Sequence, residues 1–323
     1  MKHLLPSLAL SLVLFSCKNA PQATEAAPTT IATPVKFNGD SAFVTLQAQC
    51  AFGERTPGST AHTKCGDYIV EKFKALGLDV IEQKSEAKMW DGKTFGLRNI
   101  IAQYNPTATE RIVIAAHWDS RPWADADKDT ANHRLPVMAA DDGASGVSVM
   151  LEVARLLKDL QPKVGVDFIC FDLEDYGVPY WGTAPADGSD WCIGSRYWAS
   201  NPHKPNYTAR YGILLDMVGG KDARFHFEGH SLRYASAEMA RIWDAAKTAG
   251  AGAYFIPEEG TYVTDDHVPM NEIAGIPTVD IIPYTKSGFS PIWHTRQDTP
   301  DKISKETLQA VGQTLLQVLS EEE

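Results

Sequence analysis

The sequence predicts an α/β fold: one folded domain whose central sheet is mixed, mostly parallel and twisted, with helices flanking it. Apolar runs of strand length, such as residues 166–171 and 211–218, alternate along the chain with helical patterns such as residues 304–319. That alternation is typical of a parallel sheet covered by helices. With 44% hydrophobic residues, the 323-residue chain can bury a sizeable core, and no internal repeat or second domain boundary is visible after residue 37.

Local signals justify the individual elements. Ser59 or Thr60 can cap the first helix, and Gly77 follows its end. The second helix follows a run of small residues and stops before Pro162. The first two strands alternate or run apolar, so we expect them to pair. In chain order we expect helix 59–76, strands 97–104 and 111–116, helix 147–160, strands 166–171 and 211–218, helix 231–249, strand 278–283 and helix 304–319.

The N-terminus has the pattern of an export signal. Lys2 precedes an apolar stretch at residues 9–15, which is too short to span a bilayer as a mature helix. The stretch ends in Leu14-Phe15-Ser16-Cys17, which resembles the lipobox of bacterial lipoprotein signals. We therefore expect cleavage before Cys17 and a lipid on Cys17. An ordinary secretory signal with an incidental cysteine is the alternative.

The chain thus divides into a lipoprotein signal peptide at 1–16, a lipidated Cys17 with a flexible tether at 17–36, and the folded domain at 37–323. The tether is rich in Ala, Thr and Pro and has few large apolar side chains, so it cannot bury a core. We expect an exported, membrane-anchored lipoprotein that faces the periplasm.

Charge and cysteine content narrow the possible partners and crosslinks. The net charge of −11 leaves no basic stripe for phosphates, which argues against a nucleic-acid partner. An exported compartment permits disulfides. Cys50 and Cys65 are the favoured pair because a short loop joins them, although other pairings stay open. Cys170 lies inside an expected core strand, so we expect it to be a buried thiol.

Imidazole and carboxylate side chains recur where the expected strands end. The strand at 166–171 runs into an acidic cluster, and the carboxyl edge of an open α/β sheet is where ligands bind. Adjacent acids are costly to desolvate, so they indicate a cation or a proton to be handled. Imidazole and carboxylate together are natural ligands for zinc. The residues are His117, Asp119, Asp142, Glu174, Asp175, Asp216 and His294.

These residues also carry a family resemblance. The motifs at 117–120, 142–146, 174–175, 215–216 and 294–299 resemble those of the co-catalytic zinc aminopeptidases, from about residue 45 to the end.

Three details point to one branch of that superfamily. Trp293 directly before the histidine, Phe289 and the segment 265–269 resemble the animal-type (type II) glutaminyl cyclases and their bacterial relatives. Those enzymes share the aminopeptidase fold, hold a single zinc and cyclise an N-terminal glutamine to pyroglutamate with release of ammonia. The resemblance implies peptides or proteins with N-terminal glutamine as substrates.

The resemblance also implies a role for each matching position. One Zn²⁺ would be held by Asp142, Asp175 and His294. Glu174 would be the general acid and base, with Asp216 and Asp265 in a hydrogen-bonded acid network beside it. The pocket walls would be Trp293, Phe289 and, from the loop after the acid pair, Trp181, with Tyr180 and Trp191 as the alternatives. His117 would be a structural residue beside the metal, His267 would orient Asp265 or Asp266, and a cis peptide would join Asp142 to Gly143.

The chain departs from the family at one ligand and leaves two other functions open. Asp175 stands where the animal enzymes usually have glutamate, and it reaches about one methylene less far. The first alternative is a two-zinc aminopeptidase, in which His117 and Asp216 join a second metal and Glu174 activates water. The second is an inactive lipoprotein that only binds peptides. Trp293 and the segment 265–267 favour the cyclase.

Overall fold

The computed structural model of the chain describes Met1, residues 31–186 and residues 188–322. The predicted signal peptide and the predicted lipidation site Cys17 lie outside these described residues. A compact unit spans Ala32–Glu323, so it begins before residue 37, where the sequence placed the start of the folded domain. Among the described residues, no helix combines the length and the apolar character needed to cross a bilayer.

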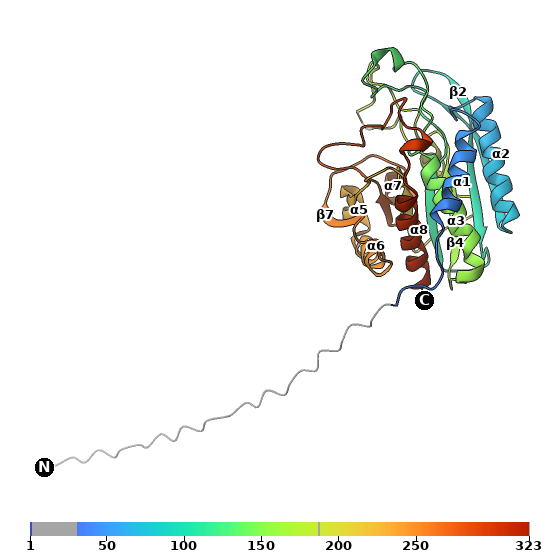
Figure 1. The fold of residues 1–323 in the computed structure, drawn as a ribbon. Helices are drawn as coiled ribbons and strands as arrows, with labels where there is room; N and C mark the ends of the chain where they lie inside the picture. The colour runs from blue at the N-terminus through green and yellow to red at the C-terminus, as the bar shows by residue number, and fades with distance from the viewer. Residues whose placement is uncertain (2–30, 187, 323) are drawn as a thin grey trace. The chain divides into compact units, whose positions relative to one another are not determined.

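A six-stranded mixed sheet forms the centre of this unit (Figure 1). The four strands on one side are parallel, and the first two strands of the chain add to the other side in antiparallel orientation. The order is β1 (Asp79–Lys88), β2 (Thr94–Tyr104), β4 (Gly165–Phe171), β3 (Arg111–His117), β5 (Tyr211–Leu215) and β8 (Thr278–Ile281). A small separate sheet pairs β6 (Phe225–Phe227) with β7 (Phe255–Glu259). The predicted fold class is confirmed.

The expected pairing of the strands at 97–104 and 111–116 is wrong. β4 lies between them, antiparallel to β2 and parallel to β3. Every residue of β4 is buried, as expected for a strand covered on both faces. A strand of this kind lies in the middle of the sheet. It pairs with both β2 and β3, so these two strands, although consecutive in the chain, do not pair with each other.

Helices cover both faces of the sheet because alternate strand residues point to opposite sides. Ile112 and Ile114 face the larger core with α2 (Thr60–Ala75) and α6 (Ser236–Thr248), whereas Val113 and Ala115 face a smaller core with two short helices. The larger core also holds α1 (Gly39–Cys50), α3 (Ala144–Leu160) and α8 (Lys305–Ser320), which lie side by side in Figure 1. The short helices are α4 (Ile193–Ser200) and α7 (His267–Glu272).

Several boundaries differ from the predicted ones. The helix expected at 231–249 is two helices, α5 (Gly229–Tyr234) and α6, which are separated by the non-helical Ala235. The strand expected at 211–218 stops at Leu215, and Met217 then takes a left-handed conformation. The first predicted helix is confirmed as α2, and the Ser59 side chain accepts a hydrogen bond from the His62 N–H as its cap.

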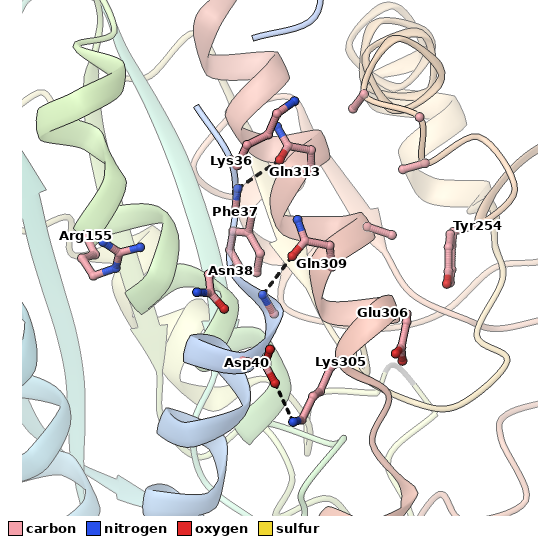
Figure 2. A pocket seen from close by; sticks show the side chains of 15 residues that line it. Lys36, Phe37, Asn38, Asp40, Arg155, Tyr254, Lys305, Glu306, Gln309 and Gln313 are labelled. Atoms are coloured by element: carbon pink, nitrogen blue, oxygen red, sulfur yellow. Dashed lines mark hydrogen bonds and ion pairs between the residues drawn. The ribbon is translucent and has the colours of Figure 1, made fainter. Parts of the chain in front are cut away.

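A ladder of three glutamines on α8 holds the segment that enters the domain, and Figure 2 shows two of them, Gln309 and Gln313. The three side chains are spaced one helical turn apart, and each accepts a backbone N–H from residues 33–39, which end at the first residue of α1. The pairs are Gly39 with Gln309, Phe37 with Gln313 and Thr33 with Gln317, at N···O distances of 2.9, 3.0 and 2.7 Å. The hydroxyl of Tyr211, the first residue of β5, donates to Glu322 just beyond α8. The chain therefore joins the domain at the amino edge of the parallel strands.

The favoured disulfide is not formed, and this expectation is wrong. Cys50 and Cys65 are free and buried in the larger core, on α1 and α2. Burial raises the pKa of Cys50 to about 11 and that of Cys65 to about 12. Both therefore behave as small apolar side chains. Cys170 is a buried thiol in β4, as expected.

An internal ion pair fixes the amino edge of the sheet. Arg111 at the start of β3 donates two hydrogen bonds of 2.7 and 2.6 Å to the carboxylate of Asp167 in β4, and both side chains are almost fully buried. Tyr207 and Gln103 also donate to Asp167. Burial alone would raise the pKa of Asp167, but the hydrogen bonds outweigh it and the pKa is lowered.

We expect Asp167→Asn to lower the free energy of unfolding by about 3 kcal/mol at pH 7, because it leaves Arg111 buried without a counter-charge. The pKa of Asp167 is depressed in the folded state, so its contribution is complete above about pH 4 and is lost as pH falls. Urea unfolding should therefore show that the wild type and Asp167→Asn differ less in their free energy of unfolding at pH 3 than at pH 7. Asp67→Asn, which removes a mostly exposed partner of Arg98, is the control and should cost less than about 1 kcal/mol. Equal losses in the two variants would contradict this account.

Candidate metal centre and cavity

The candidate site lies at the carboxyl ends of the parallel strands, on turns with strained backbones. His117 ends β3, Asp172 follows β4 and Asp216 follows β5. The turns near these ends contain residues with φ between +50° and +104°, a region that most side chains avoid. They are Ala139, Gly143, Leu173, Cys192, Met217 and His294. The left-handed residues turn the chain sharply and aim the next side chains over the sheet edge.

The three predicted zinc ligands come together. Asp142, Asp175 and His294 each offer one atom within 4.8 Å of the others. His294 Nε2 lies 3.2 Å from Asp175 Oδ1 and 3.5 Å from Asp142 Oδ2. Asp142 Oδ2 and Asp175 Oδ2 are buried without a hydrogen-bond partner. Two carboxylates and one imidazole that converge in this way fit a divalent cation such as zinc, with a coordination position left over.

A second group shares one of these residues. His117 Nε2 lies 3.0 Å from Asp142 Oδ1 and 3.4 Å from Asp216 Oδ1, and all three side chains are buried. Burial alone would lower the pKa of His117, but the carboxylates of Asp119, Asp142 and Asp216 outweigh it and the pKa is raised well above its usual value. The group could hold a metal, or a protonated His117 could neutralise the acids around it.

Two buried carboxylates fix the turns that carry the ligands. Asp119 accepts the backbone N–H groups of Glu174 and Asp175 at 3.1 and 3.2 Å. Asp298 accepts those of Asp141 and Asp142 at 2.8 and 3.2 Å. Each clamp sets the direction in which its two acids leave the backbone. Both motifs are visible in the sequence, but their role is not, because backbone hydrogen bonds leave no mark on residue spacing.

The first acid of the pair 141–142 does not join the metal groups. Asp141 Oδ1 accepts the backbone N–H of Gly219 at 2.8 Å, on the far side of the turn. Asp142 is therefore the ligand-type residue of the two, as the sequence predicted.

Arg121 and Asp125 support the metal group from behind, and neither was predicted from the sequence. Arg121 donates to both carboxylate oxygens of Asp125 at 2.7 and 2.6 Å and lies 3.4 Å from Asp175 Oδ1. Asp125 Oδ1 in turn faces His294 Nδ1 at 3.6 Å. Burial raises the pKa of Asp125, but Arg121 and His294 hold it well below its usual range. Asp125 thus orients the ring of His294, as carboxylates that hydrogen-bond the far nitrogen of a metal-binding histidine do.

Glu174 is set apart from Asp175 by its surroundings. Its side chain is 8% exposed, and Cys192 Sγ donates to its Oε1 at 3.4 Å. Burial raises its pKa well above the usual value, with Asp175 and Asp265 adding to the rise and His117 opposing it. A carboxyl group with a raised pKa takes up a proton more readily than an exposed one and can release it again.

The predicted acids Asp216 and Asp265 line the same cavity as Glu174, but no hydrogen bond joins these three among the described residues. Asp265 offers a carboxylate oxygen within 4.8 Å of ligand-type atoms of Glu174 and Cys192. Burial, with Asp265 next, raises the pKa of Asp216 to about 7. We expected His267 to orient Asp265 or Asp266, but it forms no hydrogen bond with either of them. Its Nε2 bonds Glu228 at 3.0 Å, and its Nδ1 faces Asp280 at 3.5 Å.

A cavity of about 320 Å³ opens over these groups and has aromatic walls. The ring of Trp293 stacks on His294 at 3.6 Å between centroids and on Phe289 at 4.3 Å. Trp191 faces His294 from another side, nearly parallel at 6.0 Å. Its indole packs on Gly177, where a Cβ would lie 2.0 Å from the ring. The acids Asp142, Glu174, Asp216 and Asp265 also line the cavity, together with His294.

Two sequence expectations about this cavity are wrong. Trp181 lines a different cleft, where it stacks near His133 and lies under Arg134, so Trp191 supplies the second wall. No cis peptide occurs among the described residues. The chain turns sharply at Gly143 instead, which has a φ of +104°. A Cβ atom at this position would lie 2.9 Å from the carbonyl oxygen of Asp119.

A larger hollow of about 950 Å³ between the start of α1, the segment that follows α6, and α8 is not the site (Figure 2). Its walls carry scattered charges such as Lys305, which pairs with Asp40. None of the clusters of described residues that could bind a metal lies in these walls. The reactive chemistry is confined to the smaller cavity.

Comparison with known proteins supports an enzyme of one family. The model of peptidase family M28 matches residues 99–319. The solved glutaminyl cyclase of Bacteroides thetaiotaomicron, bound to N-acetylhistamine, is 46% identical, with a TM-score of 0.88 over 90% of this chain and 99% of that chain. A structure described as a leucine aminopeptidase precursor from the same species is also 46% identical, with a TM-score of 0.88 over 91% of this chain and 100% of that chain. The bovine glutaminyl-peptide cyclotransferase is 26% identical over 81% of this chain and 76% of its own length.

We expect Asp298→Asn to lower the affinity for zinc about 10- to 100-fold, because an amide cannot accept the N–H groups of both Asp141 and Asp142. Competition with a chelating dye measures the affinity, and thermal unfolding of the metal-free protein checks that the fold persists. Asp301→Asn, an exposed acid in the same segment, is the matched control and should leave the affinity unchanged. Unchanged zinc affinity in Asp298→Asn would contradict the role assigned to this clamp.

Proposed function

The chain belongs to peptidase family M28 and, within it, to the glutaminyl cyclases of the animal type and their bacterial relatives, and we propose that it is a glutaminyl-peptide cyclotransferase. It converts an N-terminal glutamine of a peptide or protein to pyroglutamate and releases ammonia. The observation that carries this conclusion is the cavity itself. A small aromatic pocket, closed by Trp293, Phe289 and Trp191, lies directly over a buried general acid and base and a metal-type cluster.

Asp142, Asp175 and His294 would hold one zinc per chain. When bound, this zinc would supply Lewis-acid polarisation of the substrate's side-chain carbonyl. Asp119 and Asp298 orient two of these ligands through the backbone, and Asp125 orients the third.

Glu174 moves the proton that the reaction must transfer. The substrate's α-amine is protonated at neutral pH and has to lose a proton before its nitrogen can attack the side-chain amide carbon. Glu174 accepts that proton and passes it to solvent, and the free amine nitrogen attacks the amide carbon. As the new C–N bond closes the five-membered ring, the attacking nitrogen gives a second proton to Glu174. Glu174 delivers this proton to the side-chain nitrogen while the bond to that nitrogen breaks, so ammonia leaves. Burial, with Asp175 and Asp265 adding to it, keeps the pKa of Glu174 raised, so one carboxyl can serve in both directions.

The aromatic walls give the site its preference for ring closure. The nucleophile and the electrophile belong to the same residue, so orientation is the main requirement. Trp293, Phe289 and Trp191 suit a small neutral amide side chain and exclude water that would hydrolyse it. A peptidase needs the opposite, a captured water beside its metal.

A two-zinc aminopeptidase is the second candidate function, and one observation favours it. His117, Asp142 and Asp216 form a further metal-type group next to the first. In that case Glu174 would activate water.

We also propose that the protein is an exported lipoprotein that is anchored in the membrane through Cys17 and faces the periplasm. The lipobox-like residues 14–17 and the tether composition support this location. Its substrates are then exported polypeptides with N-terminal glutamine.

Purified protein should release ammonia from a Gln-initiated peptide without shortening it, and should carry one zinc per chain. The readouts are coupled ammonia detection, mass spectrometry of the peptide and elemental analysis. A Leu-initiated chromogenic amide should not be cleaved. Cleavage of that amide by a protein with two zincs would establish the aminopeptidase instead.

We expect Glu174→Gln to reduce cyclisation about 10²-fold or more while zinc stays bound, because the amide cannot carry the proton and the ligand set is untouched. Ammonia release and bound zinc are measured on the same sample. Glu71→Gln, an exposed residue of α2, is the control and should be fully active. If zinc were lost together with activity, Glu174 would be a ligand and the assigned role would be wrong.

A further inference from the structure

A second cleft, of about 290 Å³, lies on the surface and shares no lining residue with the catalytic cavity. Three segments far apart in the chain build it: the turn between β1 and β2, the loop after β3 and the loop after β4. It gathers three of the eight tryptophans of the chain. We call it the aromatic cleft, and its main side chains are Trp90, Trp123, Tyr176, Trp181, Lys93 and Arg134.

The aromatic cleft combines two accessible rings, Trp90 and Trp181, with two buried rings, Trp123 and Tyr176, that hold Trp90 in place. Trp90 is 40% exposed, yet its Nε1 donates to the carbonyl oxygen of Tyr176 at 3.0 Å. Its ring lies 5.9 Å from that of Trp123, which contacts Tyr176 edge-on at 4.8 Å. Trp181 is half-buried. Exposed apolar surface of this kind marks binding sites, and rigid aromatic rings bind a partner at low entropic cost.

The cleft also carries one cation whose charge is not neutralised by the protein. Lys93 pairs with Asp91 at 2.8 Å. The guanidinium of Arg134 lies 4.6 Å above the ring of Trp181, and no carboxylate in the described part of the chain pairs with it. A guanidinium on an aromatic face suits a carboxylate of a bound ligand, because its donors remain free.

One buried side chain contacts both the wall of the cleft and the wall of the catalytic cavity. The guanidinium of Arg121 lies between two tryptophan rings, 5.6 Å from the centroid of Trp123 in the cleft and 4.8 Å from that of Trp191 in the cavity wall. The loop after β4 carries Tyr176 and Trp181 on the cleft and Trp191 on the cavity. A polypeptide whose first residue occupies the cavity therefore has an aromatic surface within reach of its following residues.

We propose that the aromatic cleft is a second binding site for the polypeptide substrate. It takes an aromatic side chain that follows the N-terminal glutamine at a distance along the chain, and Arg134 pairs with an acidic neighbour of that side chain. The inference rests on the proposed cyclisation and adds a preference for extended substrates that contain an aromatic–acidic pair.

The test compares a short and a long substrate on the zinc-loaded full chain. The short substrate is a glutaminyl fluorogenic amide, and the long ones are Gln-initiated dodecapeptides in which a Phe-Glu pair is moved along a Gly-Ser background. For the best position of the pair, we expect Trp181→Ala and Trp90→Ala to lower kcat/KM about tenfold, mainly through KM, and to leave the short substrate unchanged. Arg134→Gln should abolish the preference for Phe-Glu over Phe-Gln. Tyr254→Ala, an aromatic residue of the far hollow, is the control.

Each result separates the cleft from the proposed function. Equal losses on short and long substrates would mean that the tryptophans act on the cavity through Arg121, and would overturn the second site. Wild-type rates that do not depend on the position of the pair would overturn it as well. Failure of the wild type to turn over the short substrate would instead refute the cyclisation itself, and with it the premise of this inference.

Discussion

Mutual repulsion among carboxylates buried at one edge of the sheet is the constraint on which the rest of the domain depends. Asp142, Glu174, Asp175, Asp216 and Asp265 are each less than a tenth exposed. So many acids in a region of low dielectric would be prohibitively costly if all were ionised and unpaired. The strands that precede them are buried and apolar, so the backbone holds these acids at the sheet edge and they cannot become solvent-exposed. The neighbouring features offset that cost: the backbone clamps, the cationic side chains and the retained protons. A cation in the group of Asp142, Asp175 and His294 would offset it further.

The way in which the repulsion is relieved also separates the functions of neighbouring residues. Arg121, His117 and His294 lie on the side of Asp142, and there the pKa is lowered, so this acid stays ionised and available to a cation. Burial, with Asp175 and Asp265 adding to it, raises the pKa of Glu174. The clamp at Asp119 also sends the two adjacent acids to different neighbours: Glu174 lies beside Asp265 and Cys192, whereas Asp175 lies beside His294 and Arg121.

The sequence made the fold class and the reactive residues predictable, because both leave local marks. Apolar runs that end in Asp or His indicate strands with reactive side chains at their ends, and the converging group of Asp142, Asp175 and His294 was predicted from such positions together with a family resemblance. Features that depend on three-dimensional packing were missed. The central position of β4 and the break at Ala235 have no local signal. The choice of Trp191 over Trp181 was decided by Gly177, whose lack of a side chain lets one indole lie flat against the loop.

The glutamine ladder on α8 has a practical consequence for how the enzyme can be handled. It ties the start of the folded unit to the amino edge of the parallel strands, whereas the cavity opens at their carboxyl edge. A resin, sensor chip or fusion partner joined just before Ala32 would therefore be attached on the side away from the cavity mouth. The molecule is suited to oriented immobilisation, in which every copy presents its entrance to the flowing solution and bulky protein substrates are not screened by the support.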